Sequence, residues 1–233
     1  MSIEYYNKPL SSRSRFQPDG GHRCFLARGH PGACDEFPFL AHLNKVAPKV
    51  AKKIVRDAVM TTGASWKSDD AGPNRIRRWA MLKSDADLAA LGINMSGLSP
   101  VIVAKLREKA AAYDACMSVA QKLTALVYGM ENAPAPPEGV RVYLESLFGP
   151  FVPNSTKCQV CLKTLDYRLF DEARRGKAEL ETAHQNPRIH TADNTGFAHR
   201  ACNIAQGNKT VAEFYDWIAT ILERAGYSVK RPS

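Results

Sequence analysis

Residues 157–214 decide the fold and read KCQVCLKTLDYRLFDEARRGKAELETAHQNPRIHTADNTGFAHRACNIAQGNKTVAEF. Two pairs of soft metal ligands frame this stretch, Cys158-x-x-Cys161 at its start and His199-x-x-Cys202 near its end. A two-residue gap lets both side chains of a turn reach one tetrahedral ion at about 2.0–2.3 Å. The pattern predicts a Cys3His zinc site. Because protein would fill all four positions, this zinc is expected to be structural.

Between the two pairs the sequence indicates regular structure. Residues 180–183 read as a strand, which ends at a His-x-x-Pro sequence that begins at His184. Further on, Thr210-Val-Ala-Glu213 is a capping box, in which each of the two side chains satisfies a free backbone amide, and it predicts a helix to about Arg224. A histidine base, an oxygen ligand and a rigid frame are what a metal-dependent phosphodiesterase requires, so the stretch indicates a nuclease.

The order of these residues resembles the HNH, or ββα-metal, endonucleases of the zinc-braced type. That family typically shows Leu-Glu-x-Asp-His-x-x-Pro first, then an asparagine five residues before a zinc ligand, and finally Cys-Asn-x-x-Lys-Gly-Asn-x-Thr-x-x-Glu-Phe. The matching positions in this chain are Leu180, Glu181, His184, Pro187, Asn194, His199, Cys202, Asn203, Gly207, Asn208, Thr210, Glu213 and Phe214. The resemblance covers residues 157–221 and does not extend to the first 150 residues.

The resemblance implies a role for each of three polar residues. His184 would be the general base that takes a proton from the attacking water, since an ordinary histidine is mostly neutral at working pH. Asn194 would hold the loop and the base in place. Asn203 would give a carbonyl oxygen to one divalent ion. Hard oxygen ligands favour Mg²⁺, for which Mn²⁺ could substitute, and the ion would neutralise charge on the phosphate.

The chain departs from the family pattern at Ala183, where the family commonly has a metal-binding Asp or His. Glu181 lies two residues earlier on the same strand face, so its carboxylate could bind the ion directly or through water. Asp193 and His190 are alternative ligands from the following loop. A further alternative is a site that binds metal poorly and no longer cuts DNA.

Composition bears on the partner and the compartment. The 233 residues are 45% hydrophobic and carry a formal net charge of +9, which favours a polyanionic partner and, with the nuclease motifs, double-stranded DNA. No apolar run approaches the roughly 20 residues of a membrane span, and the polar start does not resemble a signal peptide. A cytoplasmic protein without membrane contact is therefore expected. In that compartment, the six cysteines suggest metal binding or burial.

Prolines at 134, 136 and 137 mark a boundary within residues 133–139. We expect an α+β protein with an irregular basic arm (1–36), a mainly helical DNA-recognition region (37–139) and a zinc-braced ββα-metal nuclease domain (140–233). Apolar periodicity predicts one or two helices over residues 37–60 and short helices over 84–92 and 140–148. It also predicts a long helix from Pro100 to Val127.

The N-terminal parts hold two further candidate sites. In the arm, a second zinc could be bound by His22, Cys24, His30 and Cys34, although the cluster lacks a two-residue pair and an unstructured arm is the alternative. In the helical region, contacts with phosphate or bases are expected from Arg75, Arg77, Arg78, Lys52 and Lys53. A solvated helix face explains these basic residues equally well.

The sequence as a whole predicts a site-specific DNA endonuclease of the restriction type. A ββα module reads little sequence by itself, so the first 150 residues are expected to select the target. The alternatives are a phage or mobile-element endonuclease, and a DNA-binding reader whose nuclease site has decayed. Symmetric cutting of both strands needs two copies of the single site, which predicts a homodimer.

Overall fold

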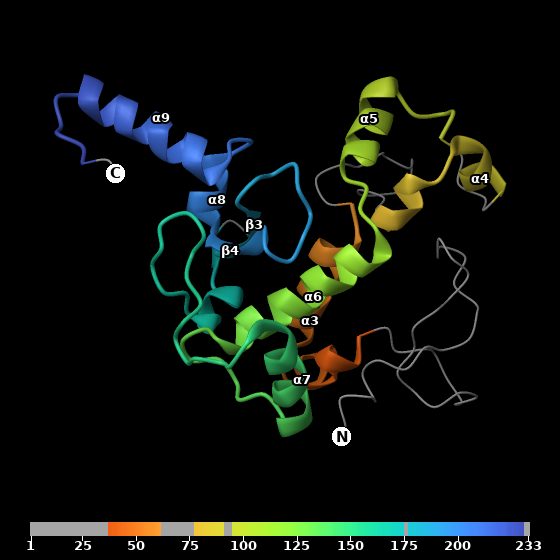
Figure 1. The fold of residues 1–233 in the computed structure, drawn as a ribbon, viewed down its shortest axis with the longest axis horizontal. Helices are drawn as coiled ribbons and strands as arrows, with labels where there is room; N and C mark the ends of the chain where they lie inside the picture. The colour runs from red at the N-terminus through yellow and green to blue at the C-terminus, as the bar shows by residue number, and fades with distance from the viewer. Residues whose placement is uncertain (1–36, 62–76, 91–94, 175–176, 231–233) are drawn as a thin grey trace.

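The computed structural model describes residues 37–61, 77–90, 95–174 and 177–230 (Figure 1). Over these residues the fold is a helix-rich α+β arrangement with two small antiparallel hairpins. The first part of the chain forms η1 (Pro38–Leu40), α2 (Ala41–Val46), α3 (Pro48–Val59), η2 (Arg78–Leu82), α4 (Asp85–Ala90), α5 (Pro100–Glu108), α6 (Tyr113–Tyr128) and α7 (Glu138–Phe148). The second part forms η3 (Tyr167–Phe170), β1 (Ala173–Arg174), β2 (Lys177–Ala178), β3 (Leu180–His184), β4 (Thr195–His199), α8 (Arg200–Gln206) and α9 (Val211–Arg224).

Helix α6 is the centre of the molecule and packs on α3, α7 and β4. Its buried residues recur at intervals of three and four, which places them on one apolar stripe: Cys116, Val119, Ala120, Leu123 and Val127. The same apolar core continues past residue 139 and takes in Leu180, Phe197 and Phe214. Buried apolar packing is therefore continuous across residues 133–139, and the domain boundary expected there stays a prediction.

Most predicted helices are present. The pattern over residues 37–60 gives η1, α2 and α3, with the expected break before Pro48, and the helices near residues 84–92 and 140–148 are α4 and α7. The capping box at Thr210 is also confirmed, because both of its reciprocal hydrogen bonds are formed. These signals succeed because they are local.

The predicted single helix from Pro100 to Val127 is wrong. It divides into α5 and α6 around residues 109–112, where Arg78 donates a hydrogen bond from Nη1 to the Lys109 carbonyl at 3.1 Å. The Ala111 amide in turn lies 3.5 Å from the Arg78 carbonyl. Residues 109–112 have helical propensity, but tertiary hydrogen bonds to η2 prevail over it.

Strands β3 and β4 pair in the register Leu180 with His199 through His184 with Thr195. Helix α8 follows β4 directly and contacts both strands, while α6 covers β4. Helix α9 extends away from the rest of the molecule (Figure 1). Because the strands are antiparallel, His184 at the end of β3 and His199 at the end of β4 lie at opposite ends of the hairpin, and α8 begins next to His199.

Candidate active site and metal centre

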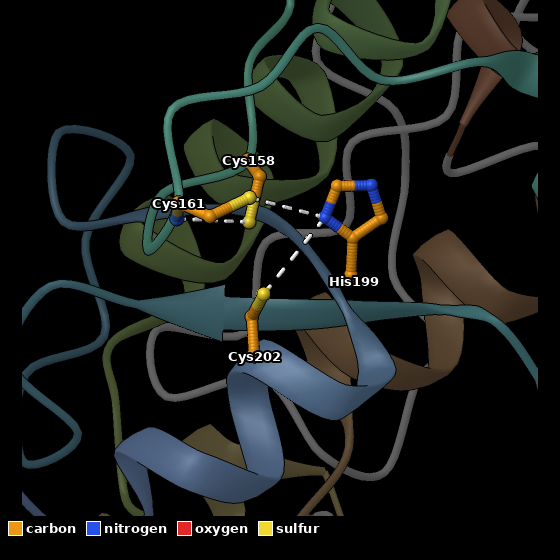
Figure 2. Close-up of side chains that lie close together, drawn as sticks. All are labelled: Cys158, Cys161, His199 and Cys202. Atoms are coloured by element: carbon orange, nitrogen blue, oxygen red, sulfur yellow. Dashed lines mark hydrogen bonds between the residues drawn. The ribbon is translucent and has the colours of Figure 1, made fainter.

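The four predicted zinc ligands lie together. The ligand atoms of Cys158, Cys161, His199 and Cys202 are all within 4.8 Å of one another, and their side chains converge in Figure 2. The Nδ1 atom of His199 is 3.3 Å from the Cys161 sulfur and 3.9 Å from the Cys202 sulfur. A tetrahedral ion with bonds of about 2.0–2.3 Å places its donor atoms roughly 3.5–3.8 Å apart. The donor set therefore fits a closed tetrahedral zinc site.

Local backbone geometry builds the first half of this centre. The Cys158 amide donates to the Lys163 carbonyl at 2.8 Å, and the Cys161 amide points at the Cys158 sulfur at 3.4 Å. Leu162 closes the turn with a φ of 60°, in the left-handed region that few branched residues occupy. The turn is fixed on β4, because the backbone N–H of Gln159 donates to the Phe197 carbonyl at 3.0 Å.

His184, the proposed base, stands at the end of β3 and is held at two points. Gln206 of α8 donates from Nε2 to the His184 carbonyl at 2.9 Å, and the ring Nε2 of His184 lies 3.2 Å from Nδ1 of His190. No described residue forms a hydrogen bond with Nδ1 of His184. Burial, followed by the nearby positive charges of Arg78 and Lys109, lowers the pKa of His184 to about 4. The imidazole is therefore neutral at neutral pH.

Asn194 is a clamp for the loop between β3 and β4. Its Oδ1 accepts the Asn186 amide at 2.8 Å, and its Nδ2 donates to the carbonyls of Asn186 at 2.8 Å and Ile189 at 2.6 Å. All three bonds are made within the loop that follows His184. The amide side chain is thus placed to fix the loop rather than to touch a substrate.

Asn203 lies on α8, one turn before Gln206 and on the same side of the helix by the three-residue spacing. Its side chain forms no hydrogen bond with any described residue. Because Gln206 reaches the His184 carbonyl, this side of α8 faces the end of β3. The free amide oxygen of Asn203 is therefore available as a hard oxygen donor.

Glu181 is engaged in ion pairs. Its Oε1 accepts from Nη1 of Arg200 at 3.0 Å, and its Oε2 is 3.7 Å from Nζ of Lys53. Within the described ranges, the Cys3His set is the one group of three or more acidic, His or Cys side chains whose ligand atoms could meet at a metal ion. The carboxylate of Glu181 is thus paired with two cations, and it does not stand free as a ligand for the expected Mg²⁺. The alternatives from the loop differ, since Asp193 is exposed while both ring nitrogens of His190 have partners.

Two of the residues predicted to contact DNA, Arg78 and Lys53, are instead largely buried and bind groups within the protein. Arg78 is 3% exposed and donates to the carbonyls of Lys109 and Asp57. The side chain of Lys53 is 11% exposed and pairs with Asp57 at 2.9 Å. Arg78 belongs to η2 and Lys53 to α3, and each of these elements packs apolar residues into the interior. There the two cations bind buried carbonyl and carboxylate oxygens. Lys52 is exposed, and Arg77 lies over the Trp79 ring with its guanidinium carbon 5.1 Å from the centroid.

Other predicted residues lie outside the described ranges. They are Arg75 and the whole second zinc cluster of His22, Cys24, His30 and Cys34.

Sequence reasoning missed Asp57, which links α3 to β3. It is 7% exposed, and its Oδ2 accepts the Thr182 hydroxyl at 2.9 Å. Burial disfavours the carboxylate, but bonds and charges from Arg56 and Lys53 prevail and lower the pKa of Asp57. The sequence does contain an indication of this role, because Asp57 falls at helical spacing on the apolar stripe of α3 with Val50 and Ile54. A carboxylate in such a position requires buried partners.

Comparison with known proteins gives the class of the fold. The chain is similar to a solved structure described as "Crystal structure of a type II restriction endonuclease", with 42% sequence identity and a TM-score of 0.77. The match covers 94% of this chain and 97% of that one. The architecture is thus that of a restriction endonuclease of this type.

The family follows from the sequence itself, because the DraIII family model matches residues 36–202. The chain belongs to the DraIII family. No sequence among the curated proteins matches it. None of the described helices combines the length and the apolar character that crossing a membrane requires.

Proposed function

We propose that the protein is a site-specific, restriction-type DNA endonuclease of the HNH, or ββα-metal, class. The observation that carries the proposal is the β3–β4 hairpin with α8, in which His184 is fixed at one end of the hairpin by α8 and four zinc-type ligands gather at the other end. Membership of the DraIII family and the likeness to a type II restriction endonuclease support the restriction type.

In the proposed reaction, His184 is the general base. Its Nδ1 accepts a proton from water, and the resulting hydroxide attacks the phosphorus of the scissile phosphodiester, after which the sugar oxygen leaves and is protonated by solvent. Because the ring is neutral at neutral pH, one of its two nitrogens carries a lone pair that can accept this proton. Asn194 keeps the adjacent loop, and with it the ring, in place.

The two metals have different roles in this proposal. Zinc bound by the Cys3His set braces the hairpin against α8 and takes no part in the reaction. Mg²⁺, or Mn²⁺ in its place, would supply charge neutralisation at the phosphate. Asn203 offers one oxygen ligand. Glu181 can be a second ligand only if it exchanges Arg200 or Lys53 for the ion.

Double-stranded DNA is the proposed substrate, and the N-terminal helical region is proposed to select the site. The net charge of +9 supports phosphate binding. Among the residues predicted to contact DNA, the exposed Lys52 and the half-buried Arg77 remain candidates. A variant with Lys52 replaced by Ala should bind DNA more weakly at all sequences, because a phosphate contact carries no base information.

A homodimer is proposed, with α9 as a contact between the two copies. On this projecting helix, large apolar side chains are 37–46% exposed: Tyr215, Trp217, Ile221 and Leu222. A second copy is the favoured occupant because one chain offers one His184 site, whereas a duplex has two strands to cut. Replacing Ile221 by Glu should shift the sedimenting species from dimer to monomer. A wild-type monomer at micromolar concentration would remove this contact.

A plasmid digestion tests the function. Supercoiled DNA of known sequence, incubated with the protein and Mg²⁺, should give discrete fragments, and EDTA should abolish them. The His184→Ala protein is the matched control for contaminating nuclease. A DNA-binding reader with a decayed site is the second candidate, and it is favoured by Ala183 and by the ion pairs of Glu181. Sequence-selective binding without any cleavage in Mg²⁺ or Mn²⁺ would establish that candidate instead.

A further inference from the structure

A second histidine stands behind the proposed base. His190 comes from the loop between β3 and β4, and its Nδ1 lies 3.2 Å from Nε2 of His184. Its other ring nitrogen, Nε2, lies 2.7 Å from the carbonyl oxygen of Ala58 in α3. Both residues are partly buried, and their ring centroids are 5.5 Å apart. The three groups form a continuous chain of hydrogen bonds from α3 to the base.

The donors in this chain follow from the chemistry of its ends. A carbonyl oxygen can only accept, so Nε2 of His190 carries the proton and donates to Ala58. In a neutral imidazole the other nitrogen is then an acceptor, and burial keeps His190 neutral by lowering its pKa to about 3. Nε2 of His184 must therefore be the donor of the 3.2 Å bond. This leaves Nδ1 of His184 as a bare lone pair.

This chain of hydrogen bonds begins at a residue outside the β3–β4 hairpin, Ala58 of α3. Ala58 is in the last turn of α3, where the final carbonyls have no partner within the helix, and His190 satisfies one of them. The neighbouring Asp57 fixes the same turn on β3 through Thr182, while Arg78 binds the Asp57 carbonyl at 3.3 Å. The end of α3 is thus held from several sides and offers a firm anchor.

We propose that His190 is a positioning residue for the cleavage reaction. It holds His184 in the tautomer with a proton on Nε2, so that the lone pair on Nδ1 faces the attacking water. The proposal rests on the proposed role of His184 as the base. It also ties the orientation of that base to α3, which belongs to the N-terminal helical region. With both ring nitrogens occupied, His190 is not available as the missing metal ligand.

Two substitutions distinguish a hydrogen-bonding role of the His190 side chain from a role in filling space. His190→Leu fills the space without an acceptor, whereas His190→Asn places an amide oxygen near the former position of Nδ1. The Leu variant should cleave saturating DNA at least about tenfold more slowly, since loss of the correct tautomer slows a histidine base strongly. Its Kd for the same DNA in Ca²⁺ should be unchanged. The Asn variant should recover most of the rate.

His42→Leu is the matched control. His42 is another partly buried histidine with a side-chain partner, the Tyr128 hydroxyl at 3.1 Å, but it lies on α2 and is not hydrogen-bonded to His184. This variant should cut at the wild-type rate. Equal rates for the wild type and His190→Leu would overturn the positioning role.

A spectroscopic readout tests the same proposal without DNA. In protein labelled with ¹⁵N-histidine, the nitrogen shifts of His184, assigned from the spectra of the His184 and His190 variants, should report a single tautomer with the proton on Nε2. In His190→Leu the two tautomers should mix. A proton on Nδ1 of His184 in the wild type would refute the proposal. A wild-type protein that cuts nothing would instead overturn the proposed function, while the spectrum still decides how His190 holds His184.

Discussion

The N-terminal helical region and the hairpin module of residues 157–224 differ in how many large apolar side chains they bury. Around α3, α6 and α7, large side chains are fully buried, among them Phe39, Leu43, Trp79, Leu123 and Leu144. The module of residues 157–224 has few such side chains and depends on Leu180, Phe197 and Phe214, which join the same core. A small module with few apolar groups needs another source of stability, and a zinc ion bound by the Cys3His set would supply it. Polar residues can then occupy the surroundings of His184.

The border between the two regions is polar. Thr182 binds Asp57, His190 binds the Ala58 carbonyl, and Glu181 lies between Lys53 and Arg200. Hydrogen bonds depend on direction as well as distance, so they fix the register of β3 against α3 more strictly than apolar contact does. The apolar core therefore stabilises the fold, while the polar border orients the site.

The largest expected effect is on the zinc brace. Cys158→Ser or Cys202→Ser should unfold the module, because structural zinc contributes on the order of 10 kcal/mol of folding free energy to small domains. Metal analysis of the wild type should give at least one zinc per chain, and two if the arm cluster also binds. Cys116→Ala is the matched control, since it removes a buried thiol of α6 that lies outside the ligand set. A folded wild-type protein without zinc would refute the brace.

The next effect concerns the base. His184→Ala should lower the single-turnover cleavage rate by at least about two orders of magnitude, which is the usual contribution of a positioned general base. Binding of DNA in Ca²⁺ should stay nearly unchanged, because the neutral ring carries no charge for phosphate. If the variant cuts as fast as the wild type, His184 has no part in the mechanism.

A third effect should appear as acid sensitivity of the polar border. In the folded state the pKa values of His184 and His190 are lowered to about 4 and about 3 by burial, with the Arg78 charge next in each case. The unfolded chain therefore binds protons first, and stability is complete above about pH 6.5 and falls as the pH drops toward 4. Between pH 7 and pH 5 the loss should reach up to about 2 kcal/mol for each histidine.

Urea unfolding at both pH values measures this loss, and His190→Asn is the variant to compare. Zinc release in acid affects both proteins equally, so the difference between them isolates the histidine. The variant should lose about 2 kcal/mol less than the wild type over the same interval. An identical loss in both would show that the histidine pair does not couple stability to pH.

The sequence predicted the parts of the fold that depend on neighbouring residues. The two-residue spacing within each pair of zinc-type ligands, the Thr210 capping box and the helix break at Pro48 are each encoded within a few positions. The division of α5 from α6 was not predictable, because the bond from Arg78 to the Lys109 carbonyl joins residues distant in sequence. For the same reason, Arg78 and Lys53 resembled surface cations until their buried carbonyl and carboxylate partners were known.

The site shows the same contrast. His184, Asn194 and Asn203 follow a motif, so their places along the hairpin and α8 could be anticipated. His190 and Asp57 could not, since their partners, the Ala58 carbonyl and the Thr182 hydroxyl, come from across the polar border. Long-range hydrogen bonds leave no periodic pattern in a sequence. An ionisable residue on an apolar stripe, as at Asp57, is the closest signal available.

The smallest expected effect concerns Glu181, where the polar border and the proposed magnesium site meet. If its carboxylate becomes a metal ligand, Arg200 competes with the ion for it, because Nη1 of Arg200 lies 3.0 Å from Oε1. Glu181→Gln should then raise the Mg²⁺ concentration for half-maximal cleavage by about tenfold, since an amide is a poorer ligand for a hard cation than a carboxylate. Arg200→Gln should lower that concentration by freeing the carboxylate. Adding Ala183→Asp to Glu181→Gln should restore part of the Mg²⁺ affinity. Unchanged Mg²⁺ dependence in both single variants would leave Glu181 as a component of the border alone, with Asn203 and solvent holding the ion.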